Sequence, residues 1–106
     1  MEFSGKKVTV VGTGISGIGA VGLLNAVGAE VVLYDGNEKL KIEDIEKKLG
    51  TYKAEIVLGE LTKELTDSSD LLVISPGVPI DSPVVKAFEA AGVPVWGLSL
   101  IHISEP

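Results

Sequence analysis

The chain has 106 residues, 45% of them hydrophobic and 23% charged, which predicts one globular domain. It has no cysteine and a single histidine, His102, so disulfides, thiolate catalysis and imidazole-rich metal sites are excluded. The net charge of -6 disfavours nucleic acid and anionic membranes as partners. No apolar run reaches the roughly 18 residues that span a bilayer, and the N-terminal sequence is not that of a signal peptide.

Strands and helices alternate along the first half of the chain. The strands are short, apolar and β-branched, as is typical of strands covered on both faces. An apolar stripe of Ile42, Ile45 and Leu49 predicts the second helix, and Gly28 and Gly50 end the two helices. The predicted elements, in chain order, are strand 7–11, helix 15–27, strand 31–34 and helix 38–49.

The second half continues this alternation. Its first strand is less apolar, which favours a place near a sheet edge, and Ser82 is predicted to cap a helix that begins at Pro83. The predicted elements are strand 54–58, one or two helical turns at 61–65, strand 70–74, a helix from 83 to 92 and strand 93–96. The connections are short, so we expect right-handed crossovers and a doubly wound, mostly parallel five-stranded sheet, ordered 3-2-1-4-5, in an α/β/α sandwich.

A glycine-rich turn joins the first predicted strand to the first predicted helix. Gly12 allows a tight turn, Gly14 lets a phosphate approach the backbone, and Gly17 lets helix and strand pack closely. The amides of Ile15, Ser16 and Gly17 are then expected to face a diphosphate at the positive end of the helix dipole. The alternative is that these glycines only make a tight turn.

Asp35 ends the second predicted strand, 18 residues after Gly17, close to the spacing at which an acid meets a ribose or a base edge. A carboxylate only accepts hydrogen bonds, so it selects hydroxyl or ring N–H groups. It also repels a 2′-phosphate, which argues against NADP. The alternative is an ordinary turn aspartate before Gly36.

The fourth predicted strand runs into Ser75-Pro76-Gly77-Val78-Pro79, beside the first strand at the point where the strand order reverses. This loop could present backbone amides to a phosphate or sugar, or it could simply lead into the helix after Ser82. There is no Walker A motif, and the lone His102 allows no Ser-His-Asp triad. We therefore expect a cytoplasmic binding module with no catalytic residue and no metal site.

The segments 7–17, Tyr34-Asp35 and 75–79 together resemble the N-terminal domain of the Mur ligases, over about residues 4–97. The resemblance is greatest to the branch that adds D-glutamate to UDP-N-acetylmuramoyl-L-alanine in peptidoglycan biosynthesis. It implies a Rossmann-like fold that binds the UDP part of a nucleotide sugar. It also implies that ATP and magnesium bind a central domain, and the amino acid a C-terminal one, so this chain would hold no cofactor itself.

By this resemblance the backbone of Ile15 and Ser16 meets the diphosphate, Asp35 with Gly36 and Asn37 addresses the uracil, and the loop after the fourth strand closes over the nucleotide. The implied UDP-binding residues are Gly12, Gly14, Ile15, Ser16, Gly17, Asp35, Gly36, Asn37, Ser75, Pro76, Gly77 and Val78.

Two features depart from the family's pattern. Gly36 and Asn37 stand where some relatives have a hydroxylated and a basic residue, and the family usually continues after Gly97 with an acid-containing stretch that enters a helix. We therefore interpret residues 1–97 as the UDP-binding domain and 98–106 as an atypical tail, an artefact of truncation or cloning.

Two other functions fit the glycines and Asp35: an NAD-binding regulatory domain that gates a transport protein, and the cofactor domain of a dehydrogenase. The loop 75–79 favours the ligase.

Overall fold

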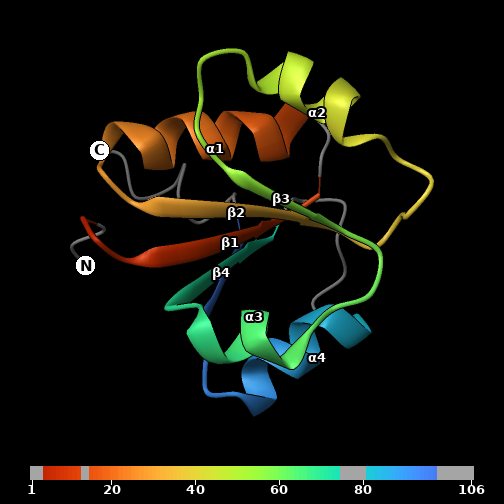
Figure 1. Ribbon diagram of the computed structural model, residues 1–106. Helices are drawn as coiled ribbons and strands as arrows, with labels where there is room; N and C mark the ends of the chain where they lie inside the picture. The colour runs from red at the N-terminus through yellow and green to blue at the C-terminus, as the bar shows by residue number, and fades with distance from the viewer. Residues whose placement is uncertain (1–3, 13–14, 75–80, 98–106) are drawn as a thin grey trace.

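The computed structural model describes residues 4–12, 15–74 and 81–97, which form one sheet between two layers of helices (Figure 1). Helices α1 and α2 cover one face of the sheet, and α3 and α4 cover the other. The elements are β1 (Lys7–Val11), α1 (Ile15–Ala26), β2 (Glu30–Asp35), α2 (Ile42–Leu49), β3 (Glu55–Leu58), α3 (Lys63–Ser68), β4 (Leu71–Ile74), α4 (Pro83–Ala90) and β5 (Val95–Gly97).

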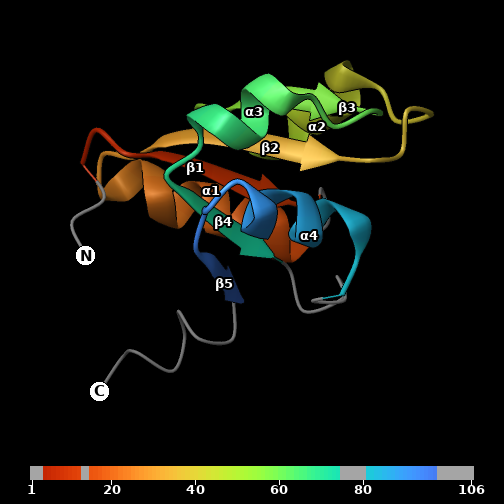
Figure 2. The ribbon, with the colours of Figure 1, turned by 90° about the horizontal axis from the view of Figure 1, so that it is seen from below.

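The sheet has five strands in the order β3-β2-β1-β4-β5, and every pair is parallel. The predicted Rossmann-like α/β fold is thus confirmed, with β3 at one edge and β5 at the other (Figure 2). At the centre of the sheet, the last residue of β1, Val11, lies opposite Tyr34 of β2 and Ile74 of β4. All strands therefore end at one edge of the sheet, and the strand order reverses between β1 and β4.

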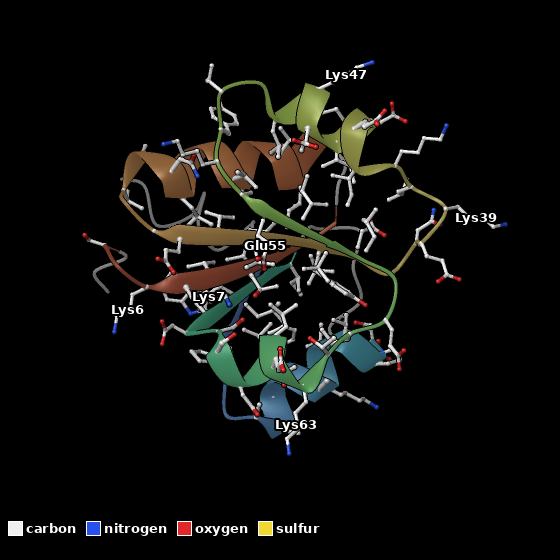
Figure 3. All side chains as sticks on the ribbon, in the orientation of Figure 1. Lys6, Lys7, Lys39, Lys47, Glu55 and Lys63 are labelled. Carbon is white, nitrogen blue, oxygen red and sulfur yellow. The ribbon has the colours of Figure 1, made fainter. Side chains whose placement is uncertain are left out.

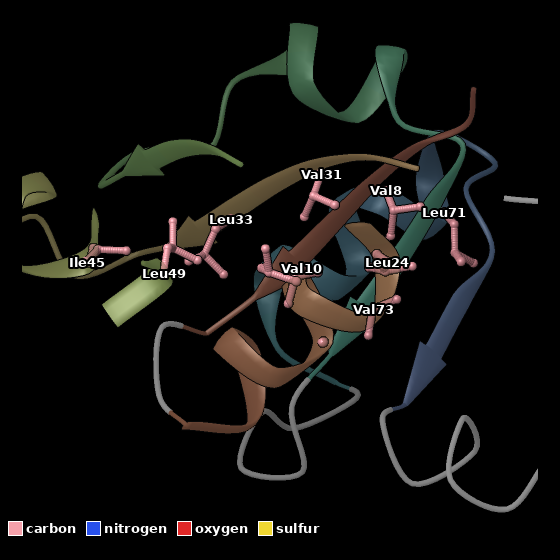
Figure 4. Close-up of a cluster of buried hydrophobic side chains, with 11 residues drawn as sticks. Val8, Val10, Leu24, Val31, Leu33, Ile45, Leu49, Leu71 and Val73 are labelled. Atoms are coloured by element: carbon pink, nitrogen blue, oxygen red, sulfur yellow. The ribbon is translucent and has the colours of Figure 1, made fainter. Parts of the chain in front are cut away.

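The central strands are buried on both faces, so their side chains divide between two hydrophobic clusters. Val8 and Val10 of β1 point toward α1 and α2, where they pack with Leu24, Leu33 and other apolar side chains (Figure 4). On the other face, side chains of β1, β2 and β4 pack against α3 and α4; this second cluster contains Val11, Val32, Tyr34, Leu65, Leu72, Ile74, Val85, Phe88 and Val93. Continuous apolar strands are what two covered faces require.

Helix α2 begins later than predicted, at Ile42 instead of residue 38. Asn37 forms a turn instead: its side-chain oxygen accepts from the Lys39 N–H at 3.0 Å and its carbonyl accepts from the Leu40 N–H at 3.2 Å. The predicted stripe was wrong at Ile42, which is 48% exposed, while Ile45 is buried.

Three smaller predictions also differ from the structure. Helix α3 spans 63–68 instead of 61–65, because the Thr62 hydroxyl accepts from the Leu65 N–H and so fixes the first turn. Ser82 occupies the predicted N-cap position of α4 but makes no capping hydrogen bond, and its hydroxyl oxygen is buried without a partner. Strand β5 begins at Val95 and not at Val93.

Candidate functional site

The turn after β1 has the close approach that the glycine pattern predicts. Gly12 has a φ of +106°, and its N–H donates to the carbonyl of Tyr34 at 2.9 Å. A Cβ on Gly17 would lie 2.9 Å from the carbonyl carbon of Gly12 and closer still to its oxygen, so only glycine fits there. The roles predicted for Gly12 and Gly17 in the turn are confirmed, whereas Gly14 lies outside the described residues.

Helix α1 begins at Ile15, so the amides of Ile15, Ser16 and Gly17 belong to its first turn. Amides in the first turn have no acceptor within their own helix, and the helix dipole places positive potential beside them. The first turn of α1 contains no acidic residue. This end of the helix can therefore receive an anion, through backbone groups alone.

Asp35 is the last residue of β2 and lies at the same sheet edge as the glycine turn. Its Oδ1 accepts from the Asn37 N–H at 2.9 Å, and its backbone carbonyl accepts from the Gly59 N–H at 2.9 Å. Gly36 and Asn37 are exposed. Asp35 thus orders its own turn, as the simpler interpretation of this residue predicted, and its carboxylate adds negative charge at this end of β2.

A hollow of about 490 Å³ opens beside Gly36, on the α3 and α4 face of the sheet. It is formed by the ends of β1 and β2, the segment after β3 and the first turn of α4. Its lining residues are Val11, Tyr34, Gly36, Glu60, Leu61, Pro83 and Val84. The site residues proposed from the sequence included only Gly36 of this set. The predicted strand order could have indicated Glu60 and Leu61, because it places the segment after β3 beside the end of β2.

Tyr34 forms one wall of the hollow and is only 5% exposed. Its hydroxyl donates to the carbonyl of Gly59 at 2.6 Å. Burial raises the pKa of the Tyr34 phenol, and the negative charges of Asp35 and Glu60 raise it further. The phenol therefore stays neutral at physiological pH, and the negative potential of the two carboxylates extends over this end of the hollow.

The predicted loop residues Ser75, Pro76, Gly77 and Val78 lie outside the described part of the chain. Figure 3 shows the labelled lysines on different sides of the molecule, with Lys39 on the loop after β2 and Lys6 and Lys7 near the start of β1. Within residues 4–12, 15–74 and 81–97, no group of three or more His, Cys, Asp and Glu side chains could hold a metal ion. In the same ranges, no helix has the length and apolar composition that would cross a bilayer.

Five parallel strands, helices on both faces and the glycine turn define a Rossmann-like α/β domain. Solved structures with this fold include shikimate dehydrogenase from Aquifex aeolicus, 17% identical with a TM-score of 0.64 over 91% of this chain and 43% of that one. A minor L-lactate dehydrogenase from Enterococcus mundtii is 23% identical, with a TM-score of 0.51 over 88% of this chain and 36% of that one. Similarity at this level of identity shows the fold alone.

The family is shown by sequence. Residues 6–97 match the family model described as Mur ligase MurD-like, N-terminal domain. The UDP-N-acetylmuramoylalanine–D-glutamate ligase of Lachnospira eligens is 62% identical over 97 residues, and that of Lachnoclostridium phytofermentans is 50% identical over 98 residues. Each alignment covers 92% of this chain and 22% of the relative, so the chain spans about a fifth of the length of these curated relatives. The chain belongs to the Mur ligase family, as a MurD-like N-terminal domain.

Proposed function

We propose that this chain binds the UDP part of UDP-N-acetylmuramoyl-L-alanine, as the N-terminal domain of a cytoplasmic ligase that adds D-glutamate in peptidoglycan biosynthesis. The observation that carries the proposal is the close approach of Gly17 to Gly12, which brings the start of α1 to the edge where β1 and β4 end. In open α/β sheets, ligands bind in the crevice at this reversal of the strand order. The family of the chain supplies the chemical class of the ligand.

The diphosphate would lie against the amides of Ile15, Ser16 and Gly17, where the helix end carries no acidic residue. The nucleoside would extend toward Asp35, Gly36 and Asn37, at the end of the neighbouring strand. Gly12 and Gly14 shape the turn in this proposal, and residues 75–78 close over the nucleotide. No lysine or arginine is needed, because backbone amides can bind an anion on an acidic protein.

The remaining steps of the proposed ligase reaction would occur outside this chain. ATP and magnesium would bind a central domain and the amino acid a C-terminal domain, both in the part of the relatives' length that this chain does not span. The isolated domain would then bind its nucleotide without catalysing a reaction. Because most ligand contacts would be absent, we expect a dissociation constant of roughly 0.1–1 mM for UDP, or about 4 to 5.5 kcal/mol.

The competing function is NAD binding, which the fold and Asp35 also permit. A proton–nitrogen NMR titration of the chain with UDP and, separately, with NAD distinguishes the two. We expect UDP to shift the amide signals of residues 15–17 and 35–37, and NAD to shift them little at the same concentration. Tighter binding of NAD than of UDP at these amides would contradict the proposed function and favour a regulatory or dehydrogenase domain instead.

Two asparagine variants sharpen this titration. Asp35→Asn removes the negative charge at the end of β2, and we expect it to weaken UDP binding by about three-fold or more, because a charged acceptor forms the stronger hydrogen bond. Asp44→Asn makes the same change in the first turn of α2, outside the site, and should leave UDP binding unchanged. Equal effects of the two variants would mean that Asp35 does not contact the ligand.

A further inference from the structure

The segment after β3 holds Glu60 at the rim of the hollow. Gly59, just before it, is fixed on both sides: its N–H donates to the carbonyl of Asp35, and its carbonyl accepts from the Tyr34 hydroxyl. A φ of +87° at Gly59 turns the chain, and the next residue lines the hollow. The backbone of Glu60 is therefore positioned by three residues of the sheet edge and does not depend on its own side chain.

The hollow offers few polar side-chain groups to a ligand. The Tyr34 hydroxyl already donates to Gly59, and the remaining walls are largely apolar, from Val11, Leu61 and Val84. The carboxylate of Glu60 takes part in none of the hydrogen bonds found among the described residues. A flat, largely apolar molecule that presents an N–H group at its edge matches this combination.

We propose that Glu60 selects the base of the nucleotide, by accepting a hydrogen bond from the ring N–H of a uracil that lies in this hollow. The inference rests on the proposed UDP binding and adds to it the residue that discriminates between bases. Uracil carries a proton on N3, whereas cytosine presents a bare lone pair there. A carboxylate cannot donate a hydrogen bond, so cytosine in the same pose would place two acceptors against each other.

The charges along the sheet edge also fix the direction of the ligand. Asp35 and Glu60 both raise the pKa of Tyr34, and Glu38 packs over Gly59, where its Oε2 lies 3.5 Å from the position that a Cβ on Gly59 would take. These three carboxylates repel a diphosphate from the ends of β2 and β3. The start of α1 has no acid and attracts one. The neutral base is the part of a nucleotide that can approach Glu60.

The test compares UDP with CDP on the full chain, by NMR titration of the wild type and of two glutamine variants. We expect the wild type to bind UDP about ten-fold more tightly than CDP, a difference in affinity that one hydrogen bond to a charged group accounts for. In Glu60→Gln the side-chain amide can either donate or accept, so the preference should fall to about two-fold, with CDP binding improved. Glu64→Gln makes the same charge change in the first turn of α3, outside the hollow, and should keep the ten-fold preference.

The outcomes separate this inference from the function on which it rests. If UDP shifts the amides of residues 15–17 but the UDP preference is the same in Glu60→Gln as in the wild type, Glu60 does not read the base and the proposed function stands. If UDP does not bind the wild type at these amides, the proposed function fails, and the role of Glu60 fails with it. UDP methylated at N3 provides a third probe, and it should bind the wild type about as weakly as CDP.

Discussion

Helices α1 and α2 cover the same face of the sheet but differ in almost every property of their sequences (Figure 1). The twelve residues of α1, ISGIGAVGLLNA, include no charged side chain and three glycines. The eight residues of α2, IEDIEKKL, include five charged ones, with acids in the first turn and lysines in the last. Helix α2 follows the ordinary rules of an amphipathic helix, and α1 does not.

The difference shows which helix is constrained by the candidate site. Glycine lowers helix stability by about 1 kcal/mol relative to alanine, so three glycines in α1 require a reason outside the helix. Two of them have one: Gly17 lies against the Gly12 carbonyl, and Gly22 lies under the ring of Tyr52. The sequence of α1 thus reflects the groups that pack closely against it, the Gly12 carbonyl and the Tyr52 ring. The sequence of α2 reflects a helix with one face in water and the other against the core.

The largest expected effect is that of alanine at Gly17. Gly17→Ala should lower the free energy of unfolding by about 4 kcal/mol, because its Cβ would overlap backbone atoms that cannot move aside. The control is Gly19→Ala in the same helix, where a Cβ would meet nothing within 4 Å; it should raise stability by about 0.5–1 kcal/mol. Urea unfolding measures both, and effects of the same sign would contradict the assignment of Gly17 as a packing glycine.

A smaller effect is expected in α2, where the core contact is made by isoleucine. Ile45 is 2% exposed, so Ile45→Ala should cost about 3 kcal/mol through lost burial and the cavity left behind. Ile42 is 48% exposed at the start of the same helix, and Ile42→Ala should change stability by less than about 0.5 kcal/mol. Thermal and urea unfolding of the pair would test this. A large loss of stability in Ile42→Ala would contradict this and support the original prediction that Ile42 packs in the core.

The smallest effect is expected at Gly22, where the close neighbour is a movable side chain. A Cβ there would lie 2.6 Å from the Tyr52 ring, which is 44% exposed and can turn away, so Gly22→Ala should cost only about 1 kcal/mol. In a Tyr52→Ala background the same change should stabilise by about 0.5–1 kcal/mol, since only the helix preference for alanine remains. A double-mutant cycle measures this change of sign; additivity of the two substitutions would show that the ring does not restrict Gly22.

Local sequence signals predicted much of the fold. The β-branched residues of β1 predicted its bounds, and Gly28, with a φ of +81° and an N–H that donates to Asn25, ends the first helical segment as its position indicated. The start of α2 could not be predicted in this way. Residues 38–41 are compatible with a helix, and only the hydrogen bonds of Asn37 and Lys39 show that they form a turn.

In the candidate site, too, the part formed by neighbouring residues was predictable from the sequence, and the part formed by distant residues was not. The glycine turn is encoded by a few consecutive residues, so its geometry was predictable. The hollow was not, because it depends on groups far apart in the chain, such as the Tyr34 hydroxyl and the Gly59 carbonyl, 25 residues later. The buried hydroxyl pair of Thr9 and Ser69, 2.6 Å apart, joins β1 to the segment before β4 in the same non-local way, and no local pattern indicates it.

One side chain of α1 also holds the segment just before the edge strand. The Asn25 amide donates to the Lys53 carbonyl at 2.9 Å and accepts from the Lys53 N–H at 2.6 Å, the pattern that a neighbouring strand would offer. Strand β3 begins two residues later, and its apolar side chains are partly buried, with Ile56 and Leu58 against one core cluster and Val57 against the other. Asn25 thus holds the segment just before β3 from a helix outside the sheet. The end of α1 and the segment that enters the edge strand are therefore tied together by a single side-chain amide, so local opening of either one weakens the other.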